Sequence, residues 1–140
     1  MAIKRIIPAI VACFVLLSAG GYLIHDVWLA DAYLETIAIW RPQDSMLTHL
    51  WAAYVANLIL AAAAVLIYTR GVESKPWLGQ GIRFGILLAL VTAVPQALVQ
   101  WVVLPVSYRL AAQWIVGEGL LAVLVGILVA AICRPQPEPA

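Results

Sequence analysis

The sequence has few charged residues for its length. Of 140 residues, 11% are charged and 65% are hydrophobic, whereas soluble domains average about 25% charged and about 45–50% apolar. Eight Lys and Arg stand against seven Asp and Glu, so the chain lacks the excess of basic residues on which nucleic-acid binding depends. These shortages exclude a soluble globular domain and give no support for a nucleic-acid partner.

Long apolar runs take the place of the missing charge. A bilayer core about 30 Å thick is crossed by about 20 apolar residues in a helix, and four runs are long enough, at about residues 6–24, 50–69, 82–104 and 110–133. Because lipid cannot satisfy free backbone N–H and C=O groups, these spans are expected to be helices. The prediction is an all-α integral membrane four-helix bundle, with residues 1–140 forming a single transmembrane domain in contact with the lipid bilayer.

Basic residues predict the orientation of the four spans, because short cytoplasmic loops carry the excess of Lys and Arg. Two basic residues, Arg41 and Arg109, fall on one side. Six fall on the other side: Lys4, Arg5, Arg70, Lys75, Arg83 and Arg134. Both termini are therefore expected in the cytoplasm. In this orientation Cys13 and Cys133 lie in cytoplasmic halves of helices, where thiols stay reduced.

The outer loop, residues 25–49, is longer than a helical hairpin requires. Apolar residues recur at helical spacing from Leu29 to Trp40, with Asp31 and Glu35 on the opposite face. This pattern predicts a short amphipathic helix of about three turns, ended by Pro42. Four aromatic residues suit an interfacial belt at headgroup depth: Trp28, Tyr33, Trp40 and Trp51. The proline-rich residues 134–140 predict a flexible tail.

Polar residues inside the spans predict one polar layer. At 1.5 Å per helical residue, Asn57, Gln96 and Glu118 all fall about 10–12 Å below the outer surface. Gln100 follows Gln96 by one turn, and His25 lies higher on the same side. A carboxylate at this depth must be paired, protonated or hydrated, so Glu118 is expected to face the bundle interior, with Asn57, Gln96 or His25 as its partner. Its role is either proton-linked chemistry or the fixing of helix register.

Pro95 lies within the third span and predicts a kink there, because proline removes a backbone hydrogen bond and leaves a carbonyl free near Val91. Such a kink beside Gln96 and opposite Glu118 would widen the outer half of the bundle. Several glycines on the third and fourth spans, and Ala61 to Ala64 on the second, would allow close helix approach. Among them are Gly81, Gly85, Gly117, Gly119 and Gly126.

His25 and His49 bracket the outer loop and leave a metal or haem site open as an alternative. Their spacing matches no diagnostic metal motif, so no cofactor and no metal ligand is assigned. No nucleophile elbow, nucleotide-binding loop or paired-carboxylate motif is present, and catalysis has no positive support from the sequence.

The chain resembles a group of small bacterial four-helix inner-membrane proteins to which no activity is assigned. The resemblance covers nearly the whole chain, and it departs at Asp26, where the group has glycine after the histidine. It is carried by Leu23-Ile24-His25-Asp26, Tyr33, Trp40-Arg41-Pro42, residues 68–73 (YTRGVE), residues 79–85 (GQGIRFG), Pro95 and Cys133-Arg134-Pro135. The resemblance implies a multi-pass protein of the bacterial inner membrane and no particular chemistry.

Three functions remain open from the sequence. The first is a protein that acts by helix packing, as a homo-oligomer or as an accessory subunit of a membrane complex, and it rests on the small-residue faces and the short loops. The second is a minimal proton-linked transporter or channel that uses Glu118. The third is a haem or metal protein that uses His25 and His49.

Overall fold

The computed structural model describes residues 3–134, so that all but the first residue of the predicted tail lies outside the described residues. Every regular element in this part of the chain is helical, which confirms the predicted all-α fold. The elements are α1 (Ile3–Tyr22), η1 (Leu23–Trp28), α2 (Ala30–Glu35), η2 (Ile37–Ile39), α3 (Gln43–Arg70), α4 (Trp77–Val91), α5 (Ala93–Val103) and α6 (Tyr108–Cys133). Four helical segments are long and apolar enough to cross a membrane: Lys4–Trp28, Gln43–Arg70, Trp77–Val103 and Tyr108–Cys133.

All four spans are longer than the apolar runs in the sequence, and the first two show why. The first span continues beyond residue 24 through the π-helical turn η1 to Trp28. The second begins at Gln43 and not near residue 50, because Pro42 takes an extended conformation (ψ 143°) and the helix follows directly. Residues 43–49 are too polar for a hydropathy window, but they continue the same helix. The outer connection is therefore much shorter than the predicted loop 25–49.

The amphipathic helix of the outer connection is broken into two short pieces, α2 and the 3₁₀ turn η2. The break falls at Thr36, whose hydroxyl donates to the carbonyl of Ala32 at 3.0 Å and accepts from Trp40 Nε1 at 2.9 Å. Side-chain hydrogen bonds of this kind compete with regular helical backbone bonds. The predicted three-turn helix thus becomes a compact fold in which Trp40 returns towards the bundle.

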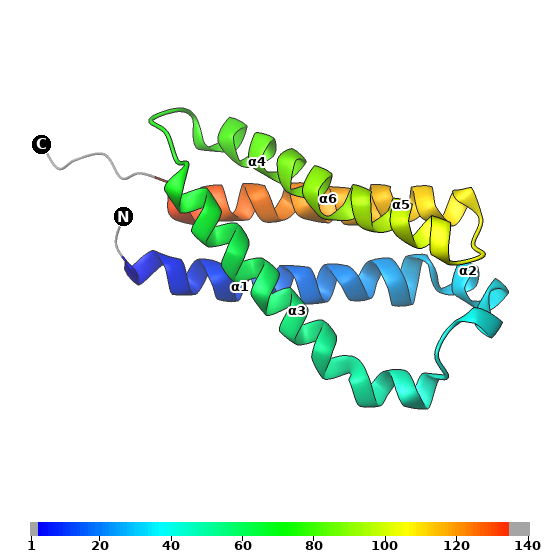
Figure 1. The fold of residues 1–140 in the computed structure, drawn as a ribbon. Helices are drawn as coiled ribbons and strands as arrows, with labels where there is room; N and C mark the ends of the chain where they lie inside the picture. Colours follow the sequence, from blue (N-terminus) through cyan, green and yellow to red (C-terminus); the bar gives the residue numbers. More distant parts are fainter. Residues whose placement is uncertain (1–2, 135–140) are drawn as a thin grey trace, which may run out of the picture.

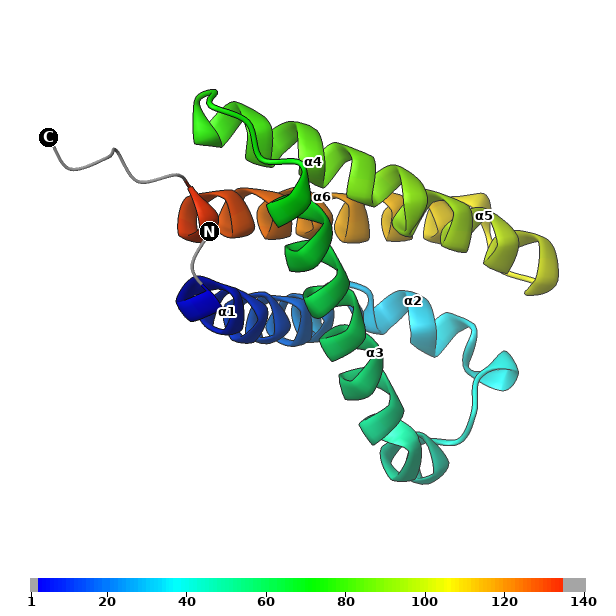
Figure 2. The same cartoon turned by 60° about the vertical axis from the view of Figure 1, so that its left-hand side comes forward.

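Helix α6 is the centre of the bundle. It lies between α1 and the α4–α5 span, and α3 crosses diagonally over the front (Figures 1 and 2). The ends of the described chain and the α3–α4 loop share one end of the bundle, while η1, α2 and α5 lie towards the other (Figure 1). We call the half of the bundle with the chain ends the proximal half, and the half with η1, α2 and α5 the distal half. At the proximal end, Arg5 Nη1 donates to the carbonyl of Arg134 at 2.9 Å.

The proximal half is closely packed. Its core joins α1, α3 and α6, and the fully buried side chains there include Cys13, Val65, Val125, Val129 and Cys133. At the same end, the buried Gln80 holds the α3–α4 loop, because its amide donates to the carbonyls of Glu73 and Lys75 at 2.8 and 2.7 Å. The hydrophobic contacts and this loop anchor together close the proximal end of the bundle.

Glycine permits the close approach of α4 to α6. A Cβ atom added at Gly126 would lie 2.4 Å from the carbonyl oxygen of Gly81 and 2.6 Å from the amide nitrogen of Gly85. A Cβ added at Gly85 would lie 2.5 Å from the Cα of Val123. The two backbones therefore touch directly, as small residues allow in membrane helix pairs. This contact sets the position of α6 and of every side chain that it carries.

The third span breaks where the sequence places Pro95. Helix α4 ends at Val91, and α5 begins at Ala93 after the irregular Thr92 (φ −117°, ψ −75°). Proline has no N–H for the Val91 carbonyl. The Thr92 hydroxyl instead turns back and donates to the carbonyl of Leu88 at 2.7 Å. The break lies in the part of the span that packs beside α6.

Helix α3 leaves the bundle as it approaches the distal end. Its second half packs on α1 and α6, with Ala61, Ala64, Val65 and Tyr68 buried. Its first half, from Gln43 to Ala56, is exposed along almost its whole length, and in Figure 1 it diverges from the other helices. A space is thereby left between α3 and α5 in the distal half.

Candidate functional site

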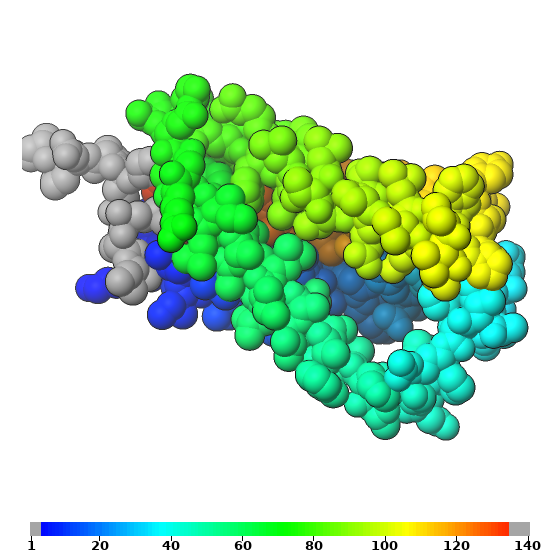
Figure 3. Space-filling view, viewed as in Figure 1, coloured from blue at the N-terminus to red at the C-terminus, as the bar shows by residue number. Residues whose placement is uncertain are grey.

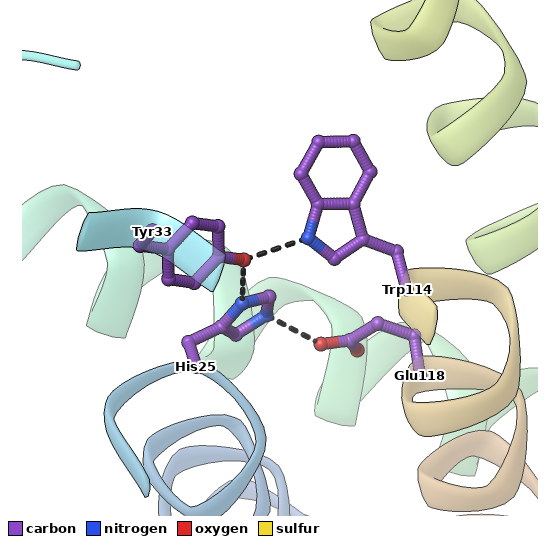
Figure 4. A network of polar contacts seen from close by, with 4 residues as sticks. All are labelled: His25, Tyr33, Trp114 and Glu118. Atoms are coloured by element: carbon purple, nitrogen blue, oxygen red, sulfur yellow. Dashed lines mark hydrogen bonds and ion pairs between the residues drawn. The ribbon is translucent and has the colours of Figure 1, made fainter. Parts of the chain in front are cut away.

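Four side chains from three elements form a polar network in the distal half (Figure 4). His25 on η1 has its Nε2 atom 2.8 Å from Oε1 of Glu118 on α6. Its Nδ1 atom lies 2.6 Å from the hydroxyl of Tyr33 on α2. That hydroxyl accepts a hydrogen bond of 2.7 Å from Nε1 of Trp114, one helical turn before Glu118. Glu118 therefore has a direct basic partner within the span.

The hydrogen bonds of this network are compatible with two charge states of His25. With His25 neutral, Nε2–H donates to an ionised Glu118, and the Tyr33 hydroxyl donates to Nδ1. With His25 protonated, both ring N–H groups donate, and the Tyr33 oxygen accepts from His25 and from Trp114. Rotation of one hydroxyl thus accommodates a proton on the imidazole without displacing the ring.

The Tyr33 hydroxyl stays protonated in both states. Burial raises the pKa of Tyr33 to about 12 against an ordinary value of 10.0, a hydrogen bond from Trp114 lowers it in part, and the nearby Glu118 and Asp26 carboxylates raise it. A neutral hydroxyl is a donor and an acceptor at once. Tyr33 therefore orients the imidazole and does not compete with it for the proton.

The network lines a cavity of about 710 Å³, which is within the usual range for a small-molecule site. The side chains of His25 and Glu118 are 40% and 34% exposed, so the pair is open to the cavity and not sealed in the core. The break at Thr92 forms part of the wall, together with Pro95. Apolar lining comes from Leu60, Val91, Ala93 and Ala97.

All five members of the predicted polar layer line this cavity: His25, Asn57, Gln96, Gln100 and Glu118. They come from η1, α3, α5 and α6, four elements separated along the chain. Asn57 also donates to the Ser18 hydroxyl on α1, at 3.4 Å. Gln96 is exposed although it lies inside a span. An amide in this position needs water or a ligand.

The cavity contains one carboxylate and, among the residues that line it, neither lysine nor arginine. Its polar atoms otherwise belong to amides, hydroxyls, an indole N–H and an imidazole. Asp26 is exposed next to His25 and adds a second negative charge nearby. The local potential therefore favours a positive or hydrogen-donating ligand over an anion.

Of the four aromatic residues expected at the membrane interface, two are exposed on the surface and two line the cavity. Trp28 and Trp51 are 50% and 65% exposed, whereas Tyr33 and Trp40 turn inward and line the cavity. The rings of Tyr33 and Trp40 meet edge to face at 5.3 Å, and Trp40 meets Trp114 in the same way at 6.3 Å. The break at Thr36 is the reason, because it folds the outer segment back on α6.

Sequence reasoning did not single out Trp114. The signal available was its position four residues before Glu118 on the same helix, which places both side chains on one face. Its indole N–H is satisfied by Tyr33, and its ring is buried in a small distal core with Leu29, Ala97, Val106 and Leu110. Trp114 thus connects the polar network to the hydrophobic packing that holds it in place.

His49, the second residue of the alternative metal or haem site, does not line the cavity. Its Nδ1 atom lies 2.7 Å from the carbonyl of Ser45, on the exposed first half of α3. Both ring nitrogens of His25 have protein partners. Within residues 3–134, no three His, Cys, Asp or Glu side chains gather as a metal site would require. This geometry gives no support for a shared site of the two histidines.

No protein-family model, curated protein or solved structure matches this chain. The class of protein is therefore defined by the fold and the cavity alone. Four membrane-capable helices make it a small multi-pass membrane protein. Its particular feature is a polar cavity in the distal half of the bundle, above a closely packed proximal half.

Proposed function

We propose that the protein is a proton-linked membrane carrier whose ligand binds in the distal cavity, beside the His25–Glu118 pair. The observation that carries the proposal is this pair, at 2.8 Å, in the wall of a 710 Å³ cavity within the membrane-spanning part of the fold. Ionisable residues inside membrane spans are costly and commonly mark substrate or proton pathways. A bonded acid and base open to a cavity can exchange a proton when a ligand binds.

A carrier agrees with the arrangement of the two halves better than a channel does. The cavity occupies the distal half, whereas the proximal half is filled by Val65, Val125 and Val129 and by the glycine contact of α4 with α6. A cavity open in one half and closed in the other is the geometry of one state of an alternating-access protein. A channel needs a continuous pathway, which this packing interrupts.

Helix packing with other subunits is a second candidate, favoured by the first half of α3. Residues 43–56 are exposed along a helix that diverges from its own bundle, and Leu47 and Trp51 there are 62% and 65% exposed. This face is suited to a second copy of the chain or to another membrane subunit. Crosslinking in native membranes tests the candidate, and a purely monomeric protein there would contradict it.

The proposed location is the bacterial inner membrane, with both termini in the cytoplasm. In support, the ends of α1 and α6 and the α3–α4 connection, which lie at the proximal end, carry most of the basic residues, as the bias of Lys and Arg towards cytoplasmic loops requires. These residues are Lys4, Arg5, Arg70, Lys75 and Arg134. The distal cavity then opens towards the outside. A green fluorescent protein fused at the C-terminus should fluoresce, and alkaline phosphatase fused there should be inactive. The opposite pair of results would reverse the orientation.

The carrier proposal is tested in liposomes that contain the purified protein and an internal pH indicator. Small cationic, zwitterionic, neutral and anionic solutes are added in turn, at imposed pH gradients of both signs. The wild type should change the internal pH with at least one solute class, and E118Q should not. The matched control is E35Q, since Glu35 is exposed on α2 outside the cavity. A folded wild type that behaves like E118Q with every solute would contradict the carrier.

The haem or metal alternative has an independent test. Absorbance spectra and metal analysis of the purified protein should show no haem band and no stoichiometric metal. A bound haem or metal that is lost in H25Q would displace the carrier proposal, because it would give His25 a different role.

A further inference from the structure

The cavity is lined by both polar and apolar side chains, which bears on the kind of ligand that it holds. His25, Gln100 and Glu118 provide polar lining, and Leu60, Val91 and Ala97 provide apolar lining. A ligand with a polar head and an apolar body can contact both kinds of lining group. This observation is independent of the charge of the pair.

The cavity also has an opening towards the lipid. Leu60 on α3 and Val91 at the end of α4 are among its lining residues, yet α3 is not among the elements that pack extensively against α4 or α5 in the described chain. Val91 is 71% exposed in the middle of a span. Figure 3 shows the surface hollowed between α3 and the α4–α5 span, with α1 and α6 visible behind. An apolar body can enter here directly from the membrane.

The charges that face the pair select the sign of the polar head. Glu118 on α6 is the carboxylate in the lining, Tyr33 on α2 is neutral, and Asp26 on η1 is acidic. From α3 and α5 the lining groups are uncharged amides, those of Asn57, Gln96 and Gln100. The aromatic rings of Tyr33, Trp40 and Trp114 add faces that attract cations. An anionic head would meet the Glu118 carboxylate, and no lysine or arginine lines the cavity to receive it.

We infer that the ligand is an amphiphilic organic cation, which enters from the lipid between α3 and the α4–α5 span and places its charged head beside Glu118. The inference rests on the proposed carrier site and names its ligand class. When His25 is protonated, the His25–Glu118 pair is neutral overall. Binding of the cation favours the neutral imidazole, so one proton leaves His25 for solvent as one cation enters. Charge balances in this exchange, and the cation and the proton compete for the same site.

The test uses full-length protein in phosphatidylcholine nanodiscs and three probes with one decyl tail: decyltrimethylammonium, decyl maltoside and decyl sulfate. Calorimetry in two buffers of different ionisation enthalpy gives both the affinity and the number of protons exchanged. Decyltrimethylammonium should bind saturably, release up to one proton per cation bound and bind more weakly as the pH is lowered, because the proton and the cation compete. E118Q should lose at least tenfold in affinity, and E35Q should match the wild type.

The L60W variant tests the entrance, because the larger side chain fills the opening. Its control is I59W, since Ile59 is 64% exposed and does not line the cavity. L60W should slow or abolish cation binding, and I59W should not. If L60W fails to fold, V91W fills the opposite side of the same opening. Wild-type binding by folded L60W and V91W would overturn the lateral entrance.

Preference for the maltoside or the sulfate, or cation binding equal in the wild type and E118Q, would overturn the ligand class. If the cation preference fails in this way while solutes still drive Glu118-dependent pH changes in liposomes, only this inference is overturned and the carrier proposal stands. If those changes are absent as well, both proposals fail together.

Discussion

Glu118 lies 2.8 Å from His25, a residue 93 positions away in the chain, and the two side chains meet at the wall of a cavity. The pair connects α6 with the π-helical end of the first span. Both side chains are partly exposed. Solvent in the cavity therefore weakens the attraction between the two charges, and a ligand can reach them. Several measurements follow from this geometry.

A double-mutant cycle of H25Q and E118Q measures the coupling of the pair. We expect each single variant to lower the free energy of unfolding and the double variant to lower it by less than their sum. The coupling energy should be about 1 kcal/mol, because a partly exposed ion pair is worth little more. Reversible unfolding in mixed micelles gives these values. Strict additivity would mean that the two side chains do not interact in the membrane protein.

The Y33F variant should be destabilised by about 1–2 kcal/mol, since it leaves the indole N–H of Trp114 and a ring nitrogen of His25 without their partner. The Trp114 environment should change too, which is visible in the fluorescence spectrum. The matched control is Y22F, because Tyr22 is 60% exposed at the end of α1. Equal stabilities of the two variants would exclude a structural role for the Tyr33 hydroxyl.

Alkaline titration should distinguish Tyr33 from the exposed tyrosines. The phenol is neutral when protonated, and burial raises its pKa in the folded protein to about 12 from 10.0. The unfolded chain therefore loses this proton first as the pH rises. The contribution of Tyr33 to stability is complete below pH 10 and is lost between pH 10 and about pH 12. The phenolate absorbance of the wild type minus that of Y33F should titrate near the upper value, and a midpoint near 10 would contradict the buried network.

Replacing Gly126 with alanine should separate α4 from α6. The new Cβ would lie 2.4 Å from the Gly81 carbonyl oxygen, which the rigid backbone cannot relieve. We expect G126A to cost about 1–3 kcal/mol of stability. The control on the same helix is G119A, whose Cβ meets its nearest neighbour, the Cβ of Ala89, at 4.0 Å. Thermal unfolding of the two variants compares them, and a stable G126A would rule out direct backbone contact.

Restoring a backbone N–H at position 95 should narrow the cavity. In P95A the alanine can donate to the Val91 carbonyl and join α4 to α5 as one continuous helix. A cysteine introduced as Q96C should react with a membrane-impermeant maleimide, and adding P95A should slow that reaction. The native Cys13 and Cys133 are buried and should not contribute. The control P8A changes a proline of α1 and should leave the rate unchanged, so an equal effect of both changes would contradict a local effect of the Pro95 break on the cavity.

The ability of the sequence to predict this fold depended on the range of each interaction. Apolar runs of sufficient length identified all four spans, because helix formation in a membrane is a local requirement of the backbone. Pro95 marked the break in the third span for the same reason. The ends of the first two spans, at Trp28 and Gln43, could not be predicted from hydropathy. The polar turns there stay helical without an apolar signal.

The candidate site divides in the same way. Depth along a helix follows from counting residues, and it was enough to group Asn57, Gln96 and Glu118 in one layer. The choice of His25 among the possible partners of Glu118 was not fixed by counting, because it depends on how η1 and α6 are rotated about their axes. The inward turn of Tyr33 and Trp40 depends on the hydroxyl of Thr36, which breaks the amphipathic helix and folds it onto Trp114.

By itself the sequence determined that this is an all-helical protein with four membrane-capable spans and that Glu118 lies deep within the last of them. Its shortage of charge made that single carboxylate conspicuous. Only the tertiary structure decided that Glu118 is paired with His25 and that the divergence of α3 from α5 leaves a cavity around the pair. The physical reason is that hydropathy is a property of each helix alone, whereas helix rotation and crossing depend on contacts such as Gly85 and Gly126, which bring distant parts of the chain together.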